Sequence, residues 1–150
     1  MKLSKDLREF IELLNSTGVK YLLVGGHAVA FHGYPRFTGD MDFFVERSES
    51  NAACIEQALR VFGFSGLGIK AADFRQAGIV VQLGRPPNRI DLLTSIDGVN
   101  FDQAWANKTT ANLDGIPVAV IGKAELIANK HATGRAQDLA DLEKIEDQGT

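Results

Sequence analysis

Apolar side chains recur along the chain with two different periods, and these periods predict where helices and strands lie. Residues 4–15 form the first predicted helix, because its apolar positions are spaced i, i+3, i+4 and i+7 and share one face: Leu7, Phe10, Ile11 and Leu14. Ser4 suits the N-cap of this helix, where a side-chain oxygen can accept a hydrogen bond from a free backbone N–H. Further helices are predicted over residues 27–32, 50–62 and 101–107.

Short apolar runs between these helices predict strands. Residues 21–24 and 40–45 are the first two. Later runs are predicted to form two hairpins, because each pair is joined by a short segment of turn-forming residues such as Asp114-Gly115. The paired runs are 79–83 with 90–94 and 108–113 with 116–121.

The chain is predicted to end with two helices, over residues 123–132 and 135–147. No internal repeat, low-complexity segment or Pro/Ser-rich linker divides the sequence. We therefore expect one α+β domain over residues 1–150, with a C-terminal helical pair at about 123–147.

Composition narrows the class of protein. Apolar residues make up 45% of the chain and charged residues 23%, which is typical of a soluble globular protein. The net charge of −3 gives no general basic surface for nucleic acid, although it is compatible with a local positive cleft. Cys54 is the only cysteine, which excludes an internal disulfide and a cysteine-cluster metal site. With no signal peptide and no long apolar run, we expect a cytoplasmic protein without a membrane segment.

The stretch over residues 21–46 carries the first candidate chemistry. A buried strand meets Gly25-Gly26, a short helix follows, and the next strand opens with Asp40 and Asp42. Side chains in a strand alternate between faces, so the two carboxylates are predicted to share one face. The glycine turn offers backbone N–H groups to phosphate, and the acids can hold the cations that neutralise it. Each motif alone is more often an ordinary turn or a solvated strand face, but their combination favours a phosphate site.

A third acid lies in a later strand. Asp91 is a charge between the apolar residues Ile90 and Leu92. The predicted hairpin brings it onto the strand beside that of Asp40 and Asp42, or one strand removed. The alternative is an aspartate that simply faces solvent.

One set of motifs carries a family resemblance: Gly25-Gly26, Gly33, Arg36-x-Thr38-x-Asp40-x-Asp42 and Asp91. The set resembles the nucleotidyltransferase superfamily with the DNA polymerase β-like fold. Within it, the chain is most similar to small bacterial proteins related to the abortive-infection (type IV toxin) nucleotidyltransferases. The resemblance implies a mixed or antiparallel sheet flanked by helices. It also implies transfer of a nucleoside monophosphate from a nucleoside triphosphate to a hydroxyl, with release of pyrophosphate.

The three acids have expected metal-binding and catalytic roles in such a reaction. Asp40 and Asp42 are expected to bind the Mg²⁺ ion that orients the triphosphate, and to share a second Mg²⁺ with Asp91. Two ions of this kind clamp the attacking and leaving oxygens of an in-line displacement. Asp91 is also expected to accept the proton of the attacking hydroxyl, directly or through water.

Other residues are expected to contact phosphate. Gly25 and Gly26 let the backbone approach the β- and γ-phosphates without a Cβ in the way. Arg36 is expected to contact phosphate or to pair with an acid, and Thr38 to bind phosphate through its hydroxyl or to brace the loop. The C-terminal helices show a weaker likeness, through which Lys130 is expected to contact the triphosphate. The alternative for Lys130 is an ordinary surface lysine.

Three readings of the function remain, and in one of them the chain is a structural domain whose acids merely face solvent. The other two place a nucleotide at the acids. The first is an active enzyme, alone or within a toxin–antitoxin or defence system. The second is a non-catalytic nucleotide-binding or partner-regulating, antitoxin-like module on the same fold. The sequence leaves open the nucleotide base, and whether the acceptor is a small molecule, a tRNA or a protein. It also leaves open whether a homodimer or a partner protein is needed, and the roles of His27, Lys123 and Asp138.

Overall fold

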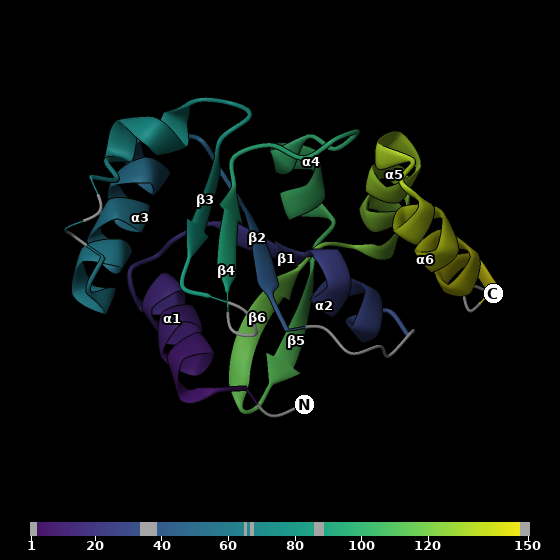
Figure 1. Ribbon diagram of the computed structural model, residues 1–150, viewed down its shortest axis with the longest axis horizontal. Coiled ribbons are helices and arrows are strands. Elements are labelled where there is room, and N and C mark those ends of the chain that lie inside the picture. Colours follow the sequence, from purple (N-terminus) through teal and green to yellow (C-terminus); the bar gives the residue numbers. More distant parts are fainter. Residues whose placement is uncertain (1–2, 34–38, 65, 67, 86–88, 148–150) are drawn as a thin grey trace.

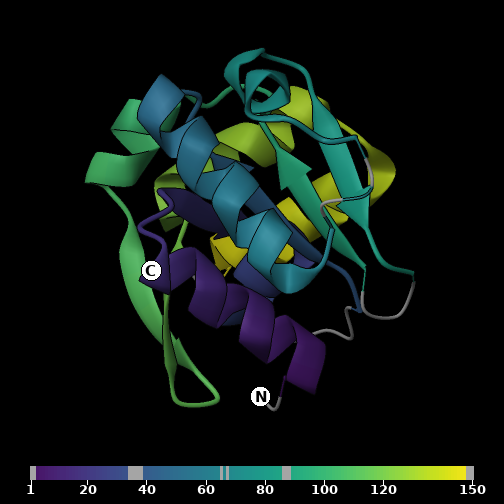
Figure 2. The same cartoon turned by 90° about the vertical axis from the view of Figure 1, so that its left-hand side faces the viewer.

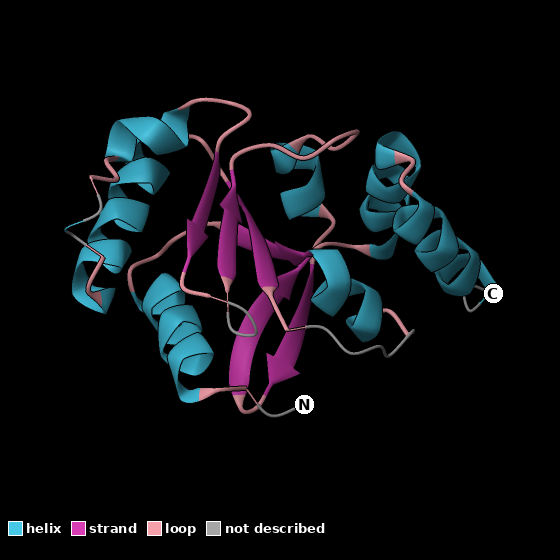
Figure 3. Ribbon diagram, in the orientation of Figure 1, coloured by secondary structure: helices cyan, strands magenta, loops and turns pink. Residues whose placement is uncertain are grey.

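The computed structural model describes residues 3–33, 39–64, 66, 68–85 and 89–147. Its centre is a mixed sheet of six strands in the order β3-β4-β2-β1-β6-β5 (Figures 1 and 3). The strands are β1 Tyr21–Val24, β2 Met41–Val45, β3 Val80–Leu83, β4 Ile90–Leu93, β5 Thr109–Leu113 and β6 Ile116–Val120. β2 and β4 pair in parallel, as do β1 and β6, while the other three pairs are antiparallel.

Helices connect these strands and cover the sheet. They are α1 Lys5–Ser16, α2 Gly25–Phe31, α3 Glu49–Phe62, the 3₁₀ helix η2 Ala71–Arg75, α4 Phe101–Ala106, α5 Lys123–Thr133 and α6 Ala136–Asp147. This confirms the expected α+β fold with two C-terminal helices. None of the helices in the described part of the chain is both long and apolar enough to cross a membrane.

The two faces of the sheet have different neighbours. Figure 2 shows α1 and α3 in front of the strands, with α5 and α6 behind them. Met41 and Phe43 point toward the first layer and are completely buried, with the Phe43 ring 5.9 Å from that of Phe10 in α1. Because strand side chains alternate, Asp42 emerges on the opposite face.

Several local predictions are confirmed. The Ser4 side chain caps α1 by accepting a hydrogen bond from the backbone N–H of Leu7, and the apolar face of the helix is buried. β5 and β6 form the expected hairpin, with positive φ angles of 54° at Asp114 and 84° at Gly115. Two consecutive positive φ angles are what a type I′ hairpin turn requires.

Two element boundaries beside the predicted acids differ from expectation. The helix after the glycine pair begins at Gly25 rather than at residue 27, and β2 begins at Met41, so Asp40 lies just before the strand. In α6, Leu139 is 51% exposed, while Asp138 and Asp141 are buried. The acids turn inward because a buried lysine binds them, as described below.

Candidate active site

Asp42 and Asp91 lie side by side on one face of the sheet. β2 and β4 run parallel, and their register sets the Cα of Asp42 opposite that of Asp91. On the other side, β1 sets Val24 opposite Asp42, so the Gly25 turn begins at the same level. Asp40 lies two residues before Asp42. The structure therefore brings the three predicted acids to the predicted glycine turn.

Arg89 links these acids. Its Nε lies 2.9 Å from Oδ1 of Asp91, and its Nη2 lies 3.2 Å from Oδ2 of the same carboxylate. The same Nη2 is 3.2 Å from Oδ2 of Asp40. Arg89 is not among the site residues predicted from the sequence. Its position two residues before Asp91 was the available signal, because residues i and i+2 of an extended segment share a face.

The surroundings of Asp42 raise the pKa of its carboxyl group. Burial raises the pKa of Asp42 to about 7, and Asp91 adds to the shift through a hydrogen bond and through charge repulsion. Asp40 repels it as well, while Arg89 acts in the opposite direction. Near neutral pH, Asp42 is thus poised between its protonated and its charged form.

Gly25 packs its backbone directly against Asp42. Its φ is +69°, a left-handed conformation that L side chains rarely adopt. A Cβ at this position would also collide with Oδ2 of Asp42. The glycine is therefore required twice, once for the turn and once for the close approach to the carboxylate.

A cleft of about 410 Å³ opens beside Asp42. One wall comes from β3, β4 and the segment after β4, and the other comes from α5 and α6. The residues that line the cleft are Val24, Gly25, Asp42, Val80, Leu93, Ser95, Ile96, Asp97, Asn129, Lys130, Thr133, Arg135 and Asp138. The cleft thus begins at Asp42 and the glycine turn, with the cations of Lys130 and Arg135 on one side and three apolar side chains on the other.

Comparison with known proteins places the chain in a family. Residues 3–149 match the model of the family described as nucleotidyl transferase of unknown function (DUF2204). The chain belongs to this family of nucleotidyltransferases. The family expected from the glycine and aspartate motifs is thereby confirmed. No curated protein matches the sequence.

Solved structures share the fold of this nucleotidyltransferase at low sequence identity. A protein assigned to the nucleotidyltransferases, TM1012 from Thermotoga maritima, is 17% identical with a TM-score of 0.60, over 95% of this chain and 91% of that one. The lincosamide antibiotic adenylyltransferase LnuA, solved with lincomycin bound, is 16% identical with a TM-score of 0.56, over 97% of each chain. An antigenic nucleotidyltransferase-like protein from Paracoccidioides brasiliensis is 18% identical with a TM-score of 0.54, over 99% of this chain and 78% of that one.

The donor chemistry of the three acids fits a hard divalent cation. Asp40, Asp42 and Asp91 supply carboxylate oxygens, the ligands that Mg²⁺ prefers. Within the described part of the chain, no group of three or more acidic, histidine or cysteine side chains is already arranged around a metal position. Arg89 gives a reason, because its guanidinium engages both oxygens of Asp91 and one of Asp40. Side-chain rotation away from Arg89 would free these oxygens for a cation.

Lys130 lies in the cleft wall at the centre of an ionic network. The residue is only 5% exposed, and its Nζ lies 2.8 Å from Asp138 Oδ1 and 3.1 Å from Asp141 Oδ2. Asp138 also accepts hydrogen bonds from Thr133 Oγ1 at 2.6 Å and from Arg135 Nε at 2.7 Å. Burial alone would raise the pKa of Asp138, but the hydrogen bonds from these three donors outweigh it and hold the pKa at about 2. The alternative of an ordinary surface lysine is therefore wrong for Lys130, while its contact with phosphate stays a prediction.

The remaining candidates have different places. Arg36 and Thr38 lie outside the described residues. Gly26 is the second residue of α2, directly after the turn. His27 is buried in α2. Lys123 is the first residue of α5, and the lining of the cleft, as far as it is described, does not include it.

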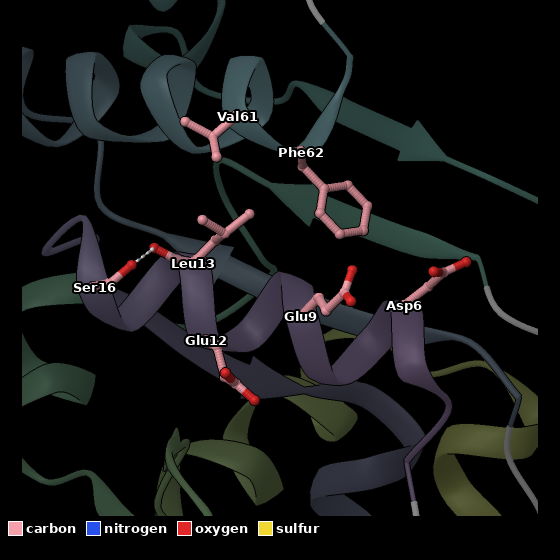
Figure 4. Close-up of a pocket in the computed structure, with 7 residues that line it drawn as sticks. All are labelled: Asp6, Glu9, Glu12, Leu13, Ser16, Val61 and Phe62. Atoms are coloured by element: carbon pink, nitrogen blue, oxygen red, sulfur yellow. Dashed lines mark hydrogen bonds between the residues drawn. The ribbon is translucent and has the colours of Figure 1, made fainter.

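A second groove, of about 660 Å³, lies on the other side of the sheet between α1 and α3. Figure 4 shows Leu13, Val61 and Phe62 facing one another across it, with acidic side chains along α1. Two of these acids pair within their own helix, Glu9 with Lys5 at 3.9 Å and Glu12 with Arg8 at 3.2 Å. This groove is separate from the three acids and supplies a useful control surface for the experiments below.

Proposed function

We propose that this nucleotidyltransferase moves a nucleoside monophosphate from a nucleoside triphosphate to a hydroxyl acceptor and depends on Mg²⁺. The observation that carries the proposal is the row formed by the Gly25 turn, Asp42 and Asp91 at one level of the sheet. A phosphate-accepting turn beside two carboxylates is what metal-assisted phosphoryl chemistry requires.

Three acids are available to the metal. Asp40, Asp42 and Asp91 would hold up to two Mg²⁺ ions, which when bound neutralise the triphosphate and polarise its phosphorus–oxygen bonds. Among the described residues, Arg89 forms its ion pairs with Asp40 and Asp91 rather than with Asp42. Burial, and then the neighbouring carboxylates of Asp91 and Asp40, raise the pKa of Asp42, and a bound cation would favour its charged form.

The protein groups would position and activate the two reactants. The backbone of Gly25 and Gly26 approaches the β- and γ-phosphates, with Arg36, Thr38 and Lys130 as further phosphate contacts. Asp91 accepts the proton of the acceptor hydroxyl, directly or through water. The acceptor oxygen then forms a bond to the α-phosphorus, the bond from that phosphorus to the bridging oxygen breaks, and the electron pair leaves with pyrophosphate.

A second candidate is nucleotide binding without transfer, within an antitoxin-like or partner-regulated module. Arg89 is the observation that favours it, because the chain itself already pairs two of the three acids. In that case a partner protein or a second copy of the chain would have to change the arrangement around Arg89. A role in a toxin–antitoxin or defence system belongs to the same proposal. The solved relative that bears a lincosamide in its name shows that this fold serves antibiotic adenylylation in another protein.

Two measurements test the proposal in turn. The first is the melting temperature with each of the four nucleoside triphosphates, with Mg²⁺ or with EDTA, because saturation at 100 times the Kd adds about 2.7 kcal/mol. The second is pyrophosphate release with a panel of hydroxyl compounds, tRNA and protein acceptors. A Mg²⁺-dependent shift with pyrophosphate release supports transfer, and the shift alone supports the binding module. The absence of any shift contradicts both.

A further inference from the structure

Strand register continues the catalytic row beyond Asp91. β3 pairs with β4 so that Gln82 lies opposite Asp91, and Val80 lies opposite Leu93. Residues directly opposite one another in a sheet present their side chains on the same face. The row that runs from Val24 through Asp42 and Asp91 therefore ends at Gln82 on the edge strand.

A second, apolar row lies next to it. Phe44, Leu93 and Val80 occupy neighbouring positions on β2, β4 and β3 and share the face of the acids. Val80 is 55% exposed, although a valine in a sheet is usually covered. Val80, Leu93 and Ile96 all line the cleft. An apolar surface that reaches solvent at Val80 thus begins at Leu93, two residues after the proposed base Asp91 on the same face of β4.

In-line displacement decides which reactant uses this surface. The attacking and leaving oxygens occupy opposite sides of the α-phosphorus. If pyrophosphate leaves toward the Gly25 turn, as the proposed function has it, the acceptor must approach from the side of β4 and β3. Asp91, the proposed base, stands between Asp42 and Gln82 in the same row.

We infer that the acceptor substrate binds to Val80, Leu93 and Ile96, which line the cleft, together with Gln82, which lies opposite Asp91 on the edge strand. This surface is named here the acceptor wall. This inference rests on the proposed function and adds the location and the chemical class of the acceptor. The three apolar side chains cover an apolar part of the acceptor. Gln82, which is exposed, offers an amide donor and an amide acceptor to a hydroxyl placed at Asp91.

Charge around the acceptor wall selects the class of compound. The described residues that line the cleft on the β3–β4 side include Asp97 and no lysine or arginine. The two cations of the opposite wall, Lys130 and Arg135, both bind Asp138. On the β3–β4 side, a polyanion such as a nucleic-acid end would meet Asp97 and no described lysine or arginine of the cleft lining. The acceptor class is therefore a small neutral or cationic hydroxyl compound with an apolar body.

Three matched probes test the inference without knowledge of the natural acceptor. Benzyl alcohol, benzylamine and benzyl phosphate share one ring and differ in charge. Each is titrated into the methyl- and ¹⁵N-labelled protein at saturating Mg²⁺ and α,β-methylene-ATP, and the methyl signals of the acceptor wall and the amide signal of Gly25 are followed by NMR. We expect benzyl alcohol and benzylamine to shift these signals, and benzyl phosphate to bind at least about tenfold more weakly, a difference of about 1.4 kcal/mol.

Two valines provide a matched pair of variants. Val80→Asn is expected to weaken benzyl alcohol binding about tenfold, because the loss of one apolar contact of this size exceeds 1 kcal/mol. Val61→Asn changes a valine that is 62% exposed in the α1–α3 groove, and it should leave the binding unchanged. The wild-type titration is independent of either variant and does not require them to fold.

Four results would overturn the inference. The first is that the triphosphate analogue itself shifts the methyl signals of the acceptor wall and excludes benzyl alcohol, which would assign the wall to the nucleobase. The second is that benzyl alcohol and benzylamine shift only the methyl signals of Val61. The third is that benzyl phosphate binds best of the three probes. The fourth is that the analogue shifts the amide signal of Gly25 while benzyl alcohol leaves the acceptor-wall signals unchanged. In that case the acceptor inference fails and the proposed function stands. An unchanged Gly25 amide means instead that the proposed function itself has failed.

Discussion

Asp42 lies directly opposite Asp91 across the parallel pair of strands β2 and β4. Two like charges at neighbouring positions of a sheet destabilise it unless positive charge compensates them. Arg89 forms an ion pair with Asp91, while burial and the two neighbouring carboxylates raise the pKa of Asp42. The functional arrangement therefore carries a cost in the folded protein, and this cost is what the predictions below measure.

Asp42→Asn should abolish Mg²⁺-dependent triphosphate binding while the protein stays folded. The substitution removes a metal ligand and also removes the charge that repels Asp91, so we expect unchanged or slightly higher stability without ligand. Melting temperatures with and without Mg²⁺ and triphosphate provide the measurement. Asp102→Asn, at an exposed acid in the first turn of α4, is the matched control and should keep the ligand-induced shift. Full binding by Asp42→Asn would remove this residue from the site.

Triphosphate affinity in the presence of Mg²⁺ should rise with pH and level off above about pH 7. The pKa of Asp42 is raised to about 7, so at lower pH a growing fraction is protonated and cannot bind the cation. The opposite sign holds for stability without ligand, because a raised carboxyl pKa favours the folded state at acid pH. Calorimetric titrations between pH 5.5 and 8.5 check the affinity, and a flat profile would contradict the assignment.

Gly25→Ala should be more damaging than a substitution that only strains the backbone. An alanine at Gly18, where φ is +77° and no atom lies within 4 Å of the added Cβ, should cost about 1–2 kcal/mol from left-handed strain. At Gly25 the collision with the Asp42 carboxylate adds to a similar strain. We expect lower stability and loss of triphosphate binding for Gly25→Ala, and lower stability alone for Gly18→Ala. Urea denaturation and the thermal shift separate the two effects.

Lys130→Met should destabilise the fold by about 3–5 kcal/mol, because it leaves the carboxylates of Asp138 and Asp141 buried without their shared cation. Lys144→Met, at an exposed lysine of α6, is the control and should change little. Urea denaturation at pH 7 gives both values. A small loss for Lys130→Met would show that the two acids find other partners.

Stability should fall as the pH drops from about 4 to about 2. The folded pKa of Asp138 is about 2 against an ordinary value of 3.8, so its contribution is complete above pH 4 and disappears below pH 2. The shift corresponds to about 2 kcal/mol. Asp138→Asn should show a shallower loss over this range than the wild type, and equal slopes would argue against the network.

Phe43→Ala should cost about 3–5 kcal/mol, because it opens a cavity under β2 where the ring is completely buried. Phe31→Ala, at a ring that is 41% exposed at the end of α2, is the comparison variant and should lower the free energy of unfolding by less than about 1 kcal/mol. Denaturant midpoints give both values. Neither variant should change the triphosphate affinity per folded molecule. The pair therefore measures the contribution of the core face to stability separately from ligand binding.

The sequence predicted the elements better than the contacts between them. Alternation along β2 placed Asp42 and Phe43 on opposite faces, because a strand has a fixed period of two. The hairpin pattern joined β3 to β4, yet it left open whether Asp91 would lie beside Asp42. Only the pairing of β2 with β4, which no local motif encodes, settles that question.

The ionic network shows where local patterns fail. On a helix, a lysine among polar residues is usually exposed, and the pattern of α5 contains nothing that distinguishes Lys130. Its burial depends on α6 presenting Asp138 and Asp141, which lie three positions apart and therefore share a face. This pairing also explains why Leu139 turns to solvent. The positions of the predicted acids agree with the proposed site, while their roles await the experiments above.

The parallel pairing of β2 with β4 has a consequence for how the protein is made. Asp42 and Asp91 are about fifty residues apart in the sequence, so their contact forms only after a long loop has closed, a slow step in folding. During synthesis, β1, α2 and β2 leave the ribosome before the segment that supplies Arg89 and Asp91. A nascent chain that already carries the glycine turn and the first two acids therefore has no complete centre. The proposed centre is complete only once β4 has been synthesised and has paired with β2.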